Sequence, residues 1–165
     1  MIEDGSTLQI GYGGIPDAVV MQLTHKHDLG IHTEMVGDGI LTLLEAGAVT
    51  NRRKNFMPGK MVATFALGSK KLYKFLDRNP MVEMHPVDFT NDPYIAGQND
   101  NLMCINATLE IDLALLGWKK VENMVARAVL AGLCELEKQG SHRYTSSECK
   151  RCGKRKLVAM SACAR

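Results

Sequence analysis

A glutamate and a glycine-rich loop are the residues of this sequence whose types and spacing could do chemistry together. Glu34 follows residues 30–33, a short segment that we predict to be a strand. The loop follows an alternating apolar run, residues 8–12, and three glycines let its backbone turn tightly and approach a ligand: Gly11, Gly13 and Gly14. In an open α/β sheet, chemistry takes place beyond the carboxyl ends of the strands. We therefore expect the Glu34 carboxylate to lie beside the loop.

The segment after the glycines predicts a helix. Pro16 suits the first helical turn, and apolar residues follow it at helical spacing: Val19, Val20 and Leu23. A glycine turn in front of a helix directs backbone N–H groups, and the positive end of the helix dipole, toward an anion or an oxyanion. A plain strand-to-helix turn is the alternative, because a glycine loop alone is weak evidence for a site.

Elements that could position these residues alternate along the chain. We predict helices at residues 39–46 and after Ser69, which is a suitable N-cap, and strands at residues 61–67 and 102–113. This alternation predicts an α/β fold with a three-layer, open, mostly parallel sheet. Trp118–Gln139 has helical spacing and predicts an appended helix. The basic tail after Gly140 is expected to be poorly ordered.

Composition excludes several classes of function. The net charge of +2 over 165 residues is too small to indicate a nucleic-acid or membrane partner, and no apolar run is long enough to span a bilayer. The amino terminus lacks the features of a signal peptide. Five cysteines, an odd number scattered over the chain, indicate reduced thiols rather than a disulfide framework. We therefore expect a cytoplasmic protein.

Several motifs in order carry a more specific signal: GYGGIPDAV from Gly11, GIHTEMVGDGI from Gly30, LLEAG from Leu43, and a long stretch from Lys60 to Asn106. Together they resemble the catalytic, carboxyl-terminal half of family I CoA-transferases, in the branch of 4-hydroxybutyrate CoA-transferase and acetyl-CoA hydrolase/transferase. The resemblance runs from about residue 2 to residue 113. It implies a CoA-transferase-like catalytic domain over residues 1–114, present in part, and leaves the helix and basic tail of residues 115–165 unmatched.

The resemblance implies a mechanism and a set of site residues. Glu34 is the expected nucleophile, which attacks an acyl-CoA and passes through an acyl-glutamyl anhydride to a glutamyl-CoA thioester. Residues expected to bind coenzyme A are Gly11, Tyr12, Gly13, Gly14, Ile15 and Met103. A backbone N–H of the loop is the expected oxyanion donor. No cofactor is expected to stay bound, because CoA enters as acyl-CoA, with a small carboxylate such as acetate as the other partner. The intact protein is expected to be a homo-oligomer.

Some residues keep two interpretations. Met103 could equally be a core methionine, and the polar residues 98–101 with Asn106 could orient Glu34 or pantetheine, or satisfy their own backbone. The basic residues in the segment 51–60 could meet CoA phosphates or form a solvated turn. The histidines are interpreted as surface or half-buried residues: His25, His27, His32 and His85.

Two other functions stay open. The protein could be an acetyl-CoA hydrolase, or a non-catalytic remnant whose basic tail binds a partner. A truncated, fused or frame-shifted gene product would give such a chain. Cys149 and Cys152 resemble half of a zinc knuckle that His142 and Cys163 could complete, but one CxxC pair is weak, and we expect no metal.

Overall fold

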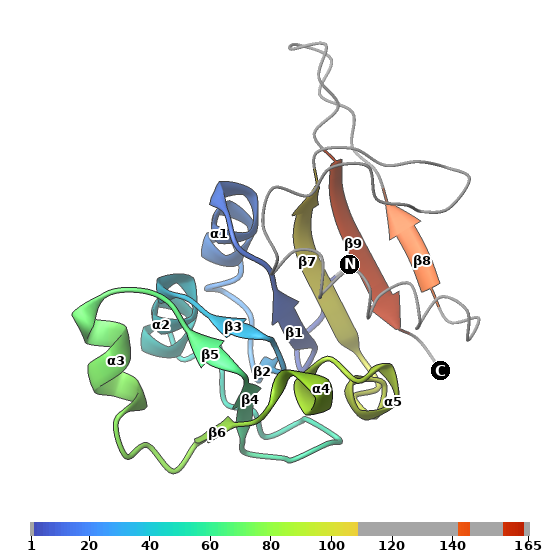
Figure 1. The fold of residues 1–165 in the computed structure, drawn as a ribbon. Helices are drawn as coiled ribbons and strands as arrows, with labels where there is room; N and C mark the ends of the chain where they lie inside the picture. The colour runs from blue at the N-terminus through green and yellow to red at the C-terminus, as the bar shows by residue number, and fades with distance from the viewer. Residues whose placement is uncertain (1, 109–141, 146–156, 164–165) are drawn as a thin grey trace.

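A parallel three-strand core organises the computed structural model, which describes residues 2–108, 142–145 and 157–163 (Figure 1). Strand β1 (Thr7–Ile10) lies between β2 (Gly30–Ile31) and β7 (Leu102–Thr108) and is parallel to both. Two further strands extend this sheet beyond β7: β8 (His142–Thr145) and β9 (Leu157–Cys163). The strand order is β2-β1-β7-β9-β8, and the β7–β9 and β9–β8 pairs are antiparallel.

Two short parallel pairs adjoin this sheet. They are β3 (Met35–Val36) with β5 (Phe65–Ala66), and β4 (Met61–Ala63) with β6 (Val82–Met84). A parallel bridge between His32 and Val62 connects β4 to the end of β2. The predicted strand over residues 61–67 is therefore divided into β4 and β5. The division occurs where the amides of Thr64 and Phe65 both bond the carbonyl of Glu34.

Helices occupy the connections between the strands. They are α1 (Gly14–Met21), α2 (Asp38–Glu45), α3 (Lys70–Leu76), α4 (Val87–Thr90) and α5 (Pro93–Ala96). The side chain of Ser69 accepts a hydrogen bond from the amide of Leu72, so the predicted N-cap of α3 is confirmed. The α/β class and the mostly parallel pairing are confirmed as well.

The hydrophobic core lies between the β2-β1-β7 sheet and the helices α1 and α2. Leu8, Ile31 and Ile105 from the three strands are fully buried, and Val20 of α1 and Leu43 of α2 pack in the same cluster. Full burial of one such side chain contributes about 1.5–3 kcal/mol. Leu8→Ala, in the central strand, is expected to cost about 2–5 kcal/mol, because the rigid neighbours would leave a cavity. This core fixes the strand ends at which the candidate site lies.

Two predictions concern the end of the chain. The predicted helix over Trp118–Gln139 lies outside the described residues. Within the segment after Gly140 the structure describes two strands, β8 and β9, at residues 142–145 and 157–163, and the predicted poor order of this segment stays a prediction. Residues 157–163 read LVAMSAC and carry no charge, so they are suited to a ladder beside β7. In the part of the chain that the structure describes, no helix has the length and apolar character needed to cross a membrane.

Candidate active site

Residues 32–34, directly after β2, present their side chains to two different neighbours. The amide of His32 donates to the carbonyl of Leu8 at 3.0 Å, which is the last main-chain bond between this segment and β1. The amide of Thr33 then bonds the carbonyl of Val62 in β4 at 3.0 Å. Side chains alternate in extended backbone. His32 and Glu34 accordingly contact residues 90–91, whereas Thr33 contacts β1.

Glu34 is buried, with an exposed fraction of 6%, and its carboxylate has a specific partner. The Nδ2 of Asn91 donates a hydrogen bond of 2.6 Å to Oε2 of Glu34. Burial raises the pKa of the Glu34 carboxyl, and the hydrogen bond from Asn91 opposes that rise. The carbonyl of Glu34 accepts from the amides of Thr64 and Phe65 at 2.9 and 3.1 Å. Both ends of this residue are therefore fixed.

His32 holds the segment that carries Asn91. Its Nε2 lies 2.8 Å from the carbonyl oxygen of Thr90, which can only accept, so Nε2 carries the hydrogen. Burial lowers the pKa of His32 to about 4, so the ring is neutral at pH 7. Its exposed fraction is 2%, and the ring packs against Phe56 at 6.1 Å between centroids. The prediction that His32 is a surface or half-buried residue is wrong, because the apolar contacts that bury it come from distant parts of the chain.

Thr33 connects Glu34 to the glycine loop. Its Oγ1 accepts a hydrogen bond from the amide of Ile10 at 3.1 Å and lies 3.0 Å from the carbonyl oxygen of the same residue, to which it can donate. Ile10 ends β1 and precedes Gly11. The loop therefore begins next to the residue that precedes the carboxylate.

The glycines of the loop differ in what a side chain would meet at each position. A Cβ on Gly11 would lie 2.2 Å from Oδ1 of Asn106, whose Nδ2 donates to Gln9 at 2.8 Å. Gly13 has φ +129°, in the region that side chains disfavour. A Cβ on Gly13 or Gly14 would meet no atom within 4 Å, so the backbone there is open to a ligand. Tyr12 is 54% exposed beside them.

A cavity of about 560 Å³ lies next to the loop. Tyr12 lines it from the loop, and Met35, the residue after Glu34, lines it from β3. Two acidic residues also line it, Asp17 and Asp38. Asp38 accepts hydrogen bonds from the amide and hydroxyl of Ser69, so its carboxylate is engaged in fixing the start of α3. Tyr12 is the loop residue that lines this cavity, whose volume is large enough for part of a small-molecule ligand.

Other predicted residues have contacts of their own. Met103 is 4% exposed and packs in the core, which supports the core interpretation; its role along a CoA path stays a prediction. Asn99 bonds the carbonyl of Ala96 at 3.2 Å, so this elbow satisfies its own backbone. The sequence-based analysis missed Asn91 as the partner of Glu34. Nothing local in the sequence shows which residue the Asn91 amide faces.

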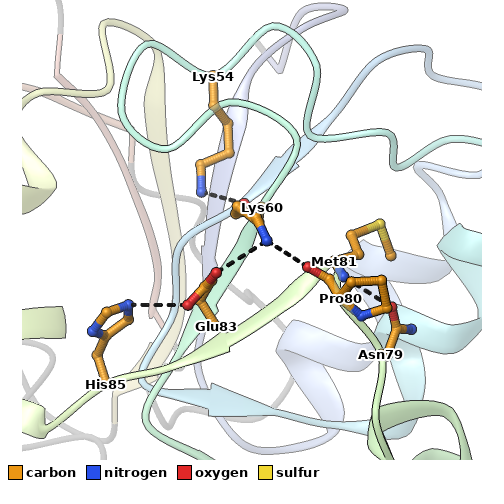
Figure 2. A network of polar contacts seen from close by, with 7 residues as sticks. All are labelled: Lys54, Lys60, Asn79, Pro80, Met81, Glu83 and His85. Carbon is orange, nitrogen blue, oxygen red and sulfur yellow. Dashed lines mark hydrogen bonds and ion pairs between the residues drawn. The ribbon is translucent and has the colours of Figure 1, made fainter.

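The basic segment 51–60 supports the structure of the strand ends (Figure 2). Lys54 is buried, and its Nζ donates to the carbonyls of Ile31 and Lys60 at 2.9 and 2.7 Å, while burial lowers its pKa to about 7. Figure 2 shows the ammonium of Lys60 between Glu83, at 3.0 Å, and the carbonyl of Pro80, at 2.6 Å. Lys54 is therefore neither solvated, as the solvated-turn interpretation of this segment would have it, nor available to a phosphate, because two backbone carbonyls hold its ammonium.

The described side chains offer no metal site. Within residues 2–106, the structure contains no group of three or more His, Cys, Asp or Glu side chains that could hold a metal ion. Cys149 and Cys152 of the possible zinc knuckle lie outside the described residues. The candidate site is therefore built from a carboxylate, an amide side chain and a glycine loop.

The fold and site define a class: an α/β domain with a buried, hydrogen-bonded carboxylate beyond the carboxyl end of a parallel strand. Residues 68–135 match the model of the acetyl-CoA hydrolase/transferase C-terminal domain. The chain is 58% identical over 113 residues to succinyl-CoA:cyclohexane-1-carboxylate CoA transferase of Geobacter metallireducens, and 50% identical over 113 residues to 4-hydroxybutyrate coenzyme A transferase of Clostridium kluyveri. Each match covers 68% of this chain and 26% of the relative.

Solved structures agree with this assignment. The crystal structure of 4-hydroxybutyrate CoA-transferase from Porphyromonas gingivalis has a TM-score of 0.65 and 47% identity, covering 68% of this chain and 29% of that one. RipA from Yersinia pestis has a TM-score of 0.65 and 46% identity, covering 68% and 26%. The matching part of this chain belongs to the acetyl-CoA hydrolase/transferase family of CoA-transferases.

The matches cover only part of the relatives, and the family match extends past the predicted domain boundary of this chain. The chain spans about a quarter of the length of the curated relatives it matches. The family match runs to residue 135, past residue 114 and into the segment where the sequence showed no likeness to the family. The boundary at 114 therefore stays a prediction.

Proposed function

We propose that this chain supplies the nucleophilic glutamate, Glu34, of a CoA-transferase that moves coenzyme A between an acyl-CoA and a small carboxylate. The observation that carries the proposal is the buried Glu34 carboxylate, held by Asn91 at 2.6 Å and connected through Thr33 to the start of the glycine loop. The names of the two curated relatives support a reaction between acyl-CoA and carboxylates, including cyclohexane-1-carboxylate and 4-hydroxybutyrate.

The chemistry follows from one carboxylate acting as a covalent carrier. An oxygen of ionised Glu34 attacks the thioester carbonyl and forms a tetrahedral intermediate. This intermediate expels the CoA thiolate and becomes an acyl-glutamyl anhydride. The thiolate attacks the glutamyl carbonyl and releases the original acyl group as a carboxylate. The resulting glutamyl-CoA thioester reacts with the acceptor carboxylate through the same steps in reverse, which regenerates Glu34 and gives a new acyl-CoA.

The glycine loop is the proposed oxyanion donor in these steps. Each tetrahedral intermediate carries a negative oxygen, and one preorganised N–H toward it is typically worth about 10²–10³ in rate. Residues proposed to contact CoA are Gly11, Tyr12, Gly13, Gly14 and Ile15, with Met103 further along its path. Asn91 holds Oε2 and leaves Oε1 as the attacking oxygen.

The proposed whole protein includes parts beyond this chain. CoA is a substrate that leaves with the product, and no permanently bound cofactor is proposed. A homo-oligomer in the cytoplasm, without a membrane or nucleic-acid partner, is the proposed setting. Hydrolysis of acetyl-CoA is the alternative reaction, which the family description includes. The relatives reported above are named for transfer, which favours a carboxylate rather than water as the acceptor.

The test is a chimera, because this chain spans about a quarter of its relatives. Residues 2–113 would replace the matching segment of the Clostridium kluyveri 4-hydroxybutyrate coenzyme A transferase. Incubation with an acyl-CoA and mass spectrometry should detect CoA attached to the peptide that contains Glu34, and the Glu34→Gln chimera should carry none. An adduct that persists in Glu34→Gln would reject Glu34 as the nucleophile.

A further inference from the structure

We propose that Thr33 is a positioning residue whose hydroxyl sets the glycine loop, residues 11–15, at a fixed distance from the Glu34 carboxylate. This inference rests on the proposed function, and it adds the residue that couples the nucleophile to its oxyanion donor. Thr33 directly precedes Glu34, and its partner Ile10 directly precedes Gly11. One side chain thus connects the two halves of the site.

The contacts of the hydroxyl are specific. Thr33 is 1% exposed, and its Oγ1 accepts from the amide of Ile10 at 3.1 Å and lies 3.0 Å from the carbonyl oxygen of Ile10. A second acceptor, the carbonyl of Met35, lies at 3.3 Å. A hydroxyl has one hydrogen and two lone pairs, so it can serve both main-chain groups of Ile10 at once.

The hydroxyl replaces main-chain hydrogen bonds that the sheet cannot supply at this point. Strands β1 and β2 pair at Thr7 with Gly30 and at Leu8 with Ile31, and the amide of His32 makes the last bond to Leu8. The backbone of the next residue then turns to β4, because the amide of Thr33 bonds Val62.

The opposite edge of β1 remains paired where the β2 edge does not. The amide of Gly11 bonds the carbonyl of Ile105 in β7 at 2.8 Å. The amide and carbonyl of Ile10 face the other edge, where β2 no longer runs beside β1. The Thr33 hydroxyl hydrogen-bonds both groups there. Buried main-chain groups without partners are strongly disfavoured. Loss of the hydroxyl should therefore allow the start of the loop to shift.

A first experiment measures position without activity, on the 165-residue chain. Thr33→Val keeps the branched shape and removes the hydroxyl, Thr33→Ser keeps the hydroxyl, and Thr50→Val removes a hydroxyl that bonds Asp28 at the other end of β2. Amide exchange followed by NMR should show Ile10 exchanging about tenfold faster in Thr33→Val. Thr33→Ser and Thr50→Val should match the unmodified chain at Ile10. Equal protection of Ile10 in Thr33→Val would overturn the proposal.

A second experiment measures catalysis in the chimera described above. A shift of ~1 Å in the loop can cost on the order of 10²-fold. Thr33→Val should lower kcat by that order with little change in KM for acyl-CoA, and Thr33→Ser should recover most of the loss. Thr50→Val should be unchanged. If Thr33→Val does not fold, Thr33→Ala removes the same hydroxyl without adding atoms, and the same loss is expected.

The outcomes separate the two proposals. An inactive Glu34→Gln chimera with a fully active Thr33→Val chimera would overturn the role of Thr33 and leave Glu34 as the nucleophile. A Thr33→Ser variant as impaired as Thr33→Val would overturn it as well, because the hydroxyl would then not be the determinant. A fully active Glu34→Gln chimera would overturn the proposed function itself.

Discussion

Asn91 donates a hydrogen bond of 2.6 Å to Oε2 of Glu34, although 57 residues separate the two in the sequence. Thr90, the neighbour of Asn91, is held in the same way by His32, two residues before Glu34. The two contacts place the end of α4 against the segment after β2. Because His32 and Thr90 are each 2% exposed, this connection is protected from water and geometrically fixed.

Two substitutions of Glu34 should show separately how activity depends on its carboxylate and on the length of its side chain. In the chimera, Glu34→Gln keeps the size and an acceptor for Asn91 but removes the nucleophile, so acyl exchange should disappear while the denaturation midpoint changes little. Glu34→Asp keeps the charge and draws it back by one methylene, and a misplacement of ~1 Å can cost on the order of 10²-fold. Initial rates of acyl exchange measure both effects. A Glu34→Gln chimera as active as the parent would contradict the assignment.

Removal of the Asn91 amide should raise the pKa of Glu34 further. Burial raises this pKa in the folded chain, and the hydrogen bond from Asn91 opposes the rise. Asn91→Leu loses the donor and keeps the burial, so the carboxyl should titrate at higher pH than in the unmodified chain. NMR titration of the Glu34 side-chain carbon measures the pKa directly. Asn55→Leu changes an exposed asparagine elsewhere and serves as the control. An unchanged or lower pKa in Asn91→Leu would contradict the prediction.

His32 should make the fold sensitive to acid. Its pKa falls from 6.5 to about 4 on folding, so the unfolded chain binds the proton more readily between these values. Stability should therefore be complete above about pH 6.5 and decrease as the pH falls toward 4, by on the order of 3 kcal/mol from this residue. Urea denaturation at pH 7, 5.5 and 4, values chosen to span that interval, measures the slope.

The control for this prediction is a second histidine. His32→Gln cannot be protonated, so the decrease in stability between pH 6.5 and 4 should be smaller than in the unmodified chain. His25→Gln, the same substitution at an exposed position, is the matched control. Equal slopes for His32→Gln and the unmodified chain would show that acid acts elsewhere.

Two glycines of the loop should respond differently to alanine. A Cβ on Gly11 would lie 2.2 Å from Oδ1 of Asn106, which is 2% exposed and cannot move freely, so Gly11→Ala should destabilise the chain by about 1–3 kcal/mol. Gly14 begins α1 in open space, so Gly14→Ala should leave stability unchanged or raise it by up to about 1 kcal/mol. Urea denaturation measures both. Equal stability of the two variants would contradict the packing argument. The proposed contact between the loop and CoA adds a separate expectation, that Gly14→Ala raises KM for acyl-CoA in the chimera.

The sequence by itself determined the features that depend on neighbouring residues. The α/β alternation, the helix after Gly13 and the Ser69 cap of α3 all follow from local periodicity and capping chemistry, and the structure confirms them. Glu34 was singled out because it follows a short strand and matches a family motif. Its role as nucleophile stays a proposal, as does the binding role of the loop.

Only the tertiary structure decided which distant groups meet. Asn91 reaches Glu34, and Lys54 is buried beneath the carbonyls of Ile31 and Lys60, because of the path the chain takes between elements. Hydrogen bonds of this kind form between residues far apart in sequence, so no local propensity predicts their partners. The Thr33 hydroxyl is such a case: its importance arises where β2 leaves β1 for β4, and that divergence exists only in the folded chain.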